Sequence, residues 1–152
     1  MAIPRLVPIS YEPDYRTAHI GHYDEGQFFG SVTATIDDGS GADVEWSRSK
    51  RWYAVLHRFD ARGAHTGSDI WFAGTSAEQD AAVERARDRL GEWLAELPGA
   101  VFGDIAVRLF RVEAEGRVFG LVDESAEYGE AHAEFLPDEL GFDHPWDGSY
   151  DV

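Results

Sequence analysis

The chain has 152 residues, of which 43% are hydrophobic and 13% aromatic, and it contains no cysteine. This composition favours one folded domain over residues 1–152, and it excludes disulfides, thiolate catalysis and cysteine-ligated metal sites. With 13 basic and 29 acidic residues the formal net charge is −16, which repels phosphate backbones and anionic membrane surfaces. The sequence has neither an apolar run of membrane-spanning length nor a typical signal peptide. We therefore expect a cytoplasmic protein with no nucleic-acid or membrane partner.

The first half of the sequence has the pattern of an antiparallel sheet. Residues 1–15 are expected to form an extended lead-in, because prolines recur there and oppose helix formation. Alternating hydrophobic patterns and turn residues predict strands over residues 17–23, 27–36, 50–59 and 66–73. Both faces of residues 50–59 carry large side chains, which indicates a central strand.

The period of the sequence changes after Gly74, and it predicts a helix of about 20 residues. Its apolar stripe consists of Val83, Ala86, Leu90, Trp93, Leu94 and Leu97. Thr75 and Ser76 each begin a capping-box pattern at its start, and Pro98-Gly99 is expected to end it.

Residues 106–114 and 117–123 alternate on both sides of Glu115-Gly116 and predict a hairpin. Residues 130–135 are expected to add an edge strand. The short connections favour antiparallel pairing. The expected fold class is therefore α+β: a twisted antiparallel sheet of about five to six strands, with one long helix packed on a face. Open sheet edges make a homodimer a possible assembly.

The end of the chain is acidic and aromatic. After Arg117 the last 35 residues contain ten acidic residues and no lysine or arginine. A surface of this kind attracts a basic protein partner, and aromatic side chains between the acids are typical anchors. Within the tail, residues 141–152, the candidate partner-binding residues are Phe142, Asp143, Trp146, Asp147 and Tyr150. Two alternatives stay open: a solubilising tail, and a Trp146 ring that covers an open end of the core.

Signatures of common catalytic sites are absent. The sequence lacks GxxxxGK[ST], GxGxxG, GxSxG and HExxH, and we expect no cofactor. The candidate metal ligands are His19, His22 and Asp24; because side chains three apart in a strand face opposite sides, they would converge only in a turn. Residues 37–45 combine carboxylates and glycines without the spacing of a calcium loop, which favours a polar loop. The sparse basic residues are Arg48, Lys50, Arg51, Arg58 and Arg62, which we interpret as a solvated strand edge.

One pair of residues suggests catalysis. His57 and Asp69 lie on neighbouring expected strands. Cross-strand approach would make them a general base and its orienting carboxylate, with Ser68 or Thr66 as the hydroxyl. A structural hydrogen-bonded pair is the favoured alternative.

Five stretches resemble a known family: residues 12–16, 50–60 (KRWYAVLHRFD), 68–75 (SDIWFAGT), 118–125 (VFGLVDES) and 144–151 (HPWDGSYD). In these stretches the chain resembles small acidic actinobacterial proteins labelled formate hydrogenlyase regulatory protein HycA-like. The resemblance spans nearly the whole chain and implies a regulator that acts on a transcription activator by protein contact. It implies no catalytic or ligand-binding residues.

The sequence leaves three functional hypotheses. The first is a non-enzymatic binding or regulatory protein that engages a basic protein through its acidic, aromatic surface. The second is an immunity or antitoxin-type neutraliser of a basic toxin, which would use the same physical attraction. The third is a small hydrolase or isomerase that uses His57 and Asp69.

Overall fold

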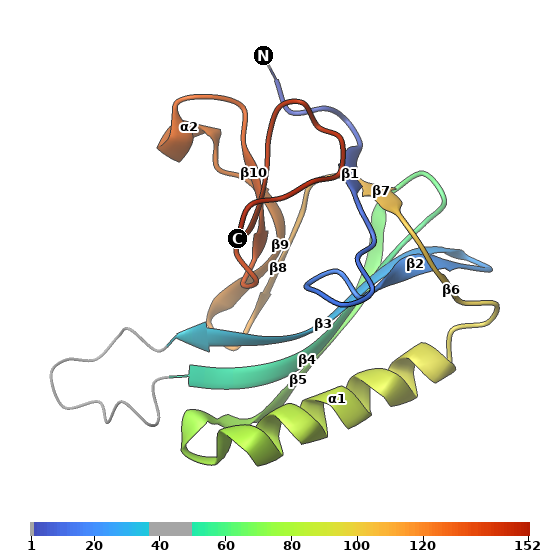
Figure 1. Cartoon of the computed structure of the whole chain (residues 1–152), viewed down its shortest axis with the longest axis vertical. Coiled ribbons are helices and arrows are strands. Elements are labelled where there is room, and N and C mark those ends of the chain that lie inside the picture. Colours follow the sequence, from blue (N-terminus) through green and yellow to red (C-terminus); the bar gives the residue numbers. More distant parts are fainter. Residues whose placement is uncertain (1, 37–49) are drawn as a thin grey trace, which may run out of the picture.

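The computed structural model describes residues 2–36 and 50–152 of the chain. In these residues the helical elements are the 3-10 turn η2 (Ser76–Glu78), α1 (Gln79–Ala95) and the short α2 (Ser125–Tyr128). The strands of the same residues are β1 (Val7–Ile9), β2 (His19–Tyr23), β3 (Gly26–Ile36), β4 (Lys50–Phe59), β5 (His65–Thr75), β6 (Val101–Phe102), β7 (Ile105–Val107), β8 (Phe110–Ala114), β9 (Arg117–Asp123), β10 (Ala133–Leu136) and β11 (Leu140–Phe142). Figure 1 shows α1 on one side of a long sheet and the strands β8 to β10 on its other side.

The middle layer is an antiparallel sheet with the strand order β5-β4-β3-β2-β6. The expected strands lie within one or two residues of β2 to β5. The strand expected to be central, β4, is an interior strand that pairs with β3 and β5, and β3 is the middle strand of the five. Neighbouring aromatic side chains of β3 point to opposite faces because the strand period is two. Phe28 packs in the cluster that contains α1, whereas Phe29 packs in the cluster that contains the second sheet. The sheet is therefore covered on both faces.

Helix α1 covers one face of this sheet. Ala82, Ala86 and Leu90 are its buried residues, and they pack against Phe28, Ala54 and Leu56. Of the expected apolar stripe, all but Val83 pack in this cluster, and the helix ends before Pro98 as expected. Val83 is only half-buried, and Ala82 is buried in the cluster instead. The expected capping box is not formed, because neither helical start has a side-chain cap. The Ser76 hydroxyl instead accepts the backbone N–H of Lys50 at 3.3 Å, which ties the start of η2 to β4.

The other face is covered by an antiparallel sheet with the order β11-β10-β9-β8. Phe29 of β3 stacks on Phe135 of β10 with ring centroids 3.9 Å apart. The α+β class, the antiparallel pairing and the single long helix are therefore confirmed. The strand expected at residues 106–114 is divided into β7 and β8. Only β8 forms the expected hairpin with β9 in this second sheet, whereas β7 pairs with β1. The strand expected at an edge, β10, instead pairs on both sides with β9 and β11.

Both ends of the chain join the folded body. In the expected lead-in, β1 pairs with β7 and buries Val7 and Ile9 completely. In the tail, Asp151 forms an antiparallel bridge with Gly141 of β11. The Ser10 N–H also donates to the Gly148 carbonyl at 3.0 Å. The lead-in and the tail are therefore in direct contact with each other.

Among the described residues, none of the helices combines the length and the apolar character that a bilayer crossing requires.

Candidate functional site

Two neighbouring hollows lie between the segment around α2 and the C-terminal tail. We call the surface formed by residues 125–134 and 139–152 the α2–tail face. The larger hollow has a volume of about 680 Å³ and includes Trp146 in its lining. The smaller one has a volume of about 310 Å³ and includes His132. Each hollow is lined by residues of both segments, the one around α2 and the C-terminal tail.

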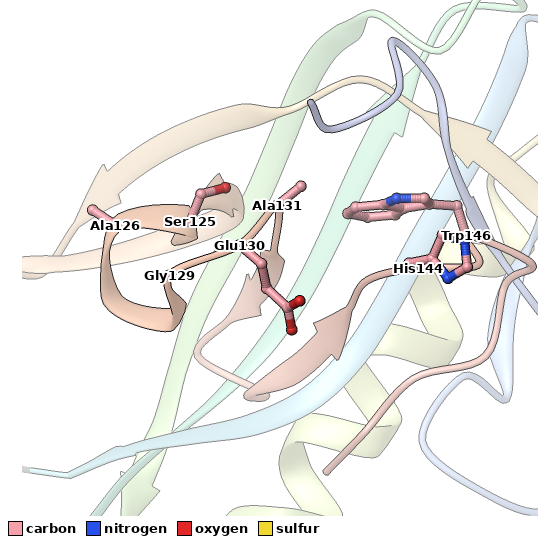
Figure 2. A pocket seen from close by; sticks show the side chains of 7 residues that line it. All are labelled: Ser125, Ala126, Gly129, Glu130, Ala131, His144 and Trp146. Atoms are coloured by element: carbon pink, nitrogen blue, oxygen red, sulfur yellow. The ribbon is translucent and has the colours of Figure 1, made fainter. Parts of the chain in front are cut away.

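The larger hollow places an aromatic ring beside acidic and small residues. Figure 2 shows the Trp146 ring extending from the tail toward Ala131 and Glu130. Trp146 has a backbone φ of 58°, a left-handed conformation that bulky residues rarely adopt. Its N–H donates to the Asp143 carbonyl at 2.8 Å, which closes the turn that holds this conformation. The half-buried ring also packs against the core, so it covers the core and lines a hollow at once.

The smaller hollow is built around a buried histidine. His132 is 5% exposed, and its ring stacks on Tyr128 with centroids 3.6 Å apart. Nε2 of His132 lies 3.5 Å from Glu134 Oε1, and Nδ1 lies 3.6 Å from Asp143 Oδ2. Within the described part of the chain, Nε2 has no hydrogen-bond partner. The imidazole therefore lies between two carboxylates, and both nitrogen–oxygen distances are longer than an ordinary hydrogen bond.

A glycine and a tyrosine shape this second hollow. A Cβ at Gly141 would lie 2.9 Å from Cε1 of His132, so only glycine permits the strand to approach the ring so closely. The Tyr128 hydroxyl donates to Glu134 at 3.0 Å. This hydrogen bond and the charge of that carboxylate raise the pKa of Tyr128.

The lining of the second hollow is strongly acidic. Its acidic residues are Glu134, Glu139, Asp143 and Asp151. Since the chain has no lysine or arginine after Arg117, neither of the two segments supplies a cation to neutralise them. Glu134 is only 18% exposed, and partial burial of this kind strengthens attraction to a cation. An ammonium or guanidinium group is the chemistry that fits this hollow.

The structure gives the five predicted tail residues different environments. Phe142 is 1% exposed and packs in the core, so its ring is not presented to a partner. Tyr150 packs against the core, with its hydroxyl 3.4 Å from Thr17 Oγ1. Asp143 lines the second hollow, whereas Asp147 accepts the Ser149 hydroxyl at 2.6 Å. Of the five, Trp146 and Asp143 line the hollows of the α2–tail face.

The expected pairing of His57 with Asp69 is wrong. The register of β4 and β5 places His57 opposite Ser68 and Leu56 opposite Asp69. Because side chains alternate between the faces of a sheet, His57 and Asp69 point to opposite sides. The Asp69 carboxylate accepts a hydrogen bond from Arg58 Nη1 at 2.6 Å, so it does not orient the imidazole of His57.

His57 instead belongs to a cluster between the two sheets. Its Nδ1 lies 2.6 Å from Ser68 Oγ, and His65 Nε2 lies 2.7 Å from the same oxygen. Burial, with the charges of His65 and Arg58, lowers the pKa of His57 to about 3. A group with so low a pKa is a poor proton acceptor at neutral pH. The hydrolase hypothesis thus loses both its orienting carboxylate and an effective base.

The expected metal ligands are also not brought together. His22 Nε2 lies 2.8 Å from the Asp104 carbonyl, whereas the His19 ring contacts Phe102 edge-on. The Asp24 carboxylate lies beside Gly99, which would clash with it if a Cβ were added. No group of three or more potential metal ligands is arranged around a common point in residues 2–36 and 50–152. The calcium-loop pattern at 37–45 and the basic residue Arg48 lie outside the described residues.

His132 and Glu134 were not among the candidates that the sequence suggested. The sequence does contain a signal, because Glu130, His132 and Glu134 stand at every second position in a segment without lysine or arginine. Alternation alone does not show which face of the strand is buried or which residue of the tail lies opposite.

Comparison with known proteins adds no relative. No protein-family model matches the chain, and no significant match is found among curated proteins or solved structures.

Proposed function

We propose that this protein is a non-enzymatic binding protein that acts by contact with a basic protein partner through the α2–tail face. The observation that carries the proposal is the His132 hollow. There a buried imidazole and partly buried carboxylates form an acidic recess, and none of the described residues that line it is a lysine or an arginine.

The two hollows support recognition of two different side chains. A lysine or arginine of the partner fits the His132 hollow, because Glu134 and Asp143 accept charge-assisted hydrogen bonds. An apolar or aromatic side chain fits the hollow beside Trp146, since aromatic rings are frequent anchors of protein interfaces. A basic residue close to an apolar one is therefore the expected recognition element of the partner.

The charge of the whole molecule supports the same class of partner. A net charge of −16 speeds the approach of a positively charged protein and slows that of a polyanion. Such attraction weakens as salt increases. The resemblance implies regulation by protein contact, and a surface that binds a basic protein is sufficient for that role.

The test begins with affinity capture from the native lysate at low salt, followed by direct binding of the purified captured protein. We expect a basic partner whose dissociation constant rises with salt. Trp146→Ala and the double variant D143N/D151N should each weaken binding by about tenfold or more. The matched control is E84Q/D88N, which removes the same charge from exposed positions of α1, on the other side of the molecule.

Two results would contradict the proposal. The first is an equal loss of binding in E84Q/D88N and D143N/D151N, because the overall charge would then account for the interaction. The second is an unchanged affinity in both D143N/D151N and W146A, provided that both variants keep the wild-type circular dichroism spectrum.

A further inference from the structure

A further polar cavity, distinct from the two α2–tail hollows, lies where five parts of the chain meet. Its volume is about 210 Å³. The lead-in, β2, β3, α1 and the turn between β10 and β11 each contribute to it, through Tyr15, Arg16, His19, Ser31, Val32, Arg87 and Asp138. Because its residues are far apart in the sequence, the sequence alone does not indicate that this cavity exists.

In the part of the chain that the structure describes, neither arginine of this cavity forms a salt bridge with a carboxylate. Arg58, Arg85 and Arg111 each lie within 3.2 Å of a carboxylate oxygen. Arg16 instead donates to a backbone oxygen, the carbonyl of Asp138, at 3.2 Å. Arg87 has no salt bridge to any described residue. In a chain with 29 acidic residues and 13 basic ones, two such arginines at one cavity make it a local exception to the negative surface.

The other polar residues of the cavity reflect this local charge. Burial and the positive charge of Arg87 lower the pKa of His19, which favours its neutral form. Burial raises the pKa of Asp138, while hydrogen bonds from Thr33 and Ser31 and the charge of Arg16 act in the opposite direction. With Asp138 ionised, the lining carries a net charge of +1, the sum of two arginines and one carboxylate. With Asp138 protonated, the excess of positive charge is larger and the carboxyl becomes a donor.

We propose that this cavity binds a small monocarboxylate, whose carboxylate group is held by Arg16 and Arg87. Guanidinium groups match a carboxylate in both charge and geometry. One negative charge neutralises the lining when Asp138 is ionised. A phosphate dianion would exceed that charge and would face the Asp138 carboxylate. The volume of the cavity accommodates a molecule of only a few heavy atoms, such as acetate or lactate.

The test is a titration of the full-length protein with sodium acetate and with sodium lactate, followed by ¹H–¹⁵N correlation spectra at constant ionic strength. We expect saturable shifts of the amide signals of Tyr15, Ser31 and Val32. Arg16→Gln and Arg87→Gln should each weaken binding at least about tenfold, since each removes a charged hydrogen-bond donor. Arg62→Gln, an exposed arginine outside the cavity, removes the same charge and should change affinity less than about twofold.

Three outcomes overturn the proposal. Shifts that spread over the surface without saturation would indicate unspecific ion effects. Acetate and lactate affinities that survive in R16Q and R87Q would place the carboxylates elsewhere. Tighter binding of inorganic phosphate than of either carboxylate would contradict the charge argument. Arg16 and Arg87 are exposed, so their variants should fold normally, and unchanged signals from β4 would verify this.

Discussion

Arg58 Nη1 lies 2.6 Å from Asp69 Oδ2, and this pair occupies the face of the central sheet opposite to His57. The ion pair explains why the carboxylate that the sequence associated with His57 is not available to it. Arg58 and Asp69 join the edge strand β5 to the neighbouring interior strand β4. His57, by contrast, contacts Phe110 and Phe135 of the second sheet.

The Arg58–Asp69 pair should contribute modestly to stability. The two side chains are 28% and 46% exposed, so solvent screens their attraction. A double-mutant cycle with R58A, D69A and R58A/D69A should give a coupling free energy of about 0.5–1 kcal/mol in urea unfolding. The coupling should shrink in high salt. A coupling that is independent of salt would show that lost packing, not charge, dominates the cycle.

His57 should make the protein less stable as the pH falls. The pKa of His57 is about 3 in the folded state, against 6.5 for an unperturbed histidine. The unfolded chain therefore binds a proton between these values that the folded chain does not. The stabilisation is complete above pH 6.5 and is lost as the pH decreases toward 3. His57→Phe should flatten the free energy of unfolding between pH 6 and 4 by about 1.4 kcal/mol per pH unit.

The control for this experiment is the exposed residue His144, replaced by glutamine. Urea unfolding of H144Q should follow the wild-type pH profile more closely than that of H57F. If H57F and the wild type lose stability in parallel down to pH 4, folding does not lower the pKa of His57. Ser68 Oγ also lies 2.7 Å from His65 Nε2, so the Ser68 hydroxyl should retain one hydrogen-bond partner in H57F.

Leu90 should be a main contributor to the packing of α1 on the central sheet. It is 2% exposed, and a Cβ built at Gly30 would lie 2.9 Å from its Cδ1. Leu90→Ala should therefore cost about 2–5 kcal/mol in the free energy of unfolding, measured by chemical denaturation. Asp88→Ala, at an exposed position of the same helix, should stay within about 0.5 kcal/mol of the wild type. Equal effects would contradict the orientation of α1.

Two glycine-to-alanine changes should have opposite signs. At Gly141 the new methyl group would lie 2.9 Å from Cε1 and 3.1 Å from Nε2 of His132. Because that ring is buried against Tyr128, G141A should destabilise the fold by about 1–3 kcal/mol. At Gly91 of α1 nothing lies within 4 Å, and G91A should stabilise the helix by about 0.5–1 kcal/mol. A neutral G141A would mean that the His132 hollow is looser than described.

Much of the fold was predictable from local patterns. The alternation in residues 27–36 and 50–59 depends only on which side chains point to the same face, and it predicted β3 and β4 closely. The apolar stripe of α1 follows from helical spacing in the same way. The second sheet was not separated from the first, because a strand pattern does not say which neighbour it joins.

The predicted pair of His57 and Asp69 does not form because of the register between β4 and β5. Between β4 and β5, Arg58 faces Gly67 while Phe59 faces His65, so Thr66 is an extra residue in a bulge. This single insertion brings Ser68 opposite His57 and turns Asp69 toward Arg58. Turn and bulge geometry cannot be read reliably from composition, and a shift of one residue exchanges the two faces.

By itself the sequence determined the acidic character, the lack of thiol chemistry, the α+β class and the aromatic tail, because composition and local periodicity are properties of neighbouring residues. Only the tertiary structure decided that His132 is enclosed by Glu134 and Asp143, and that Arg16 and Arg87 share a cavity. These groupings join segments that are distant along the chain. Their positions depend on strand register and on the packing of two sheets and a helix, which act over the whole molecule.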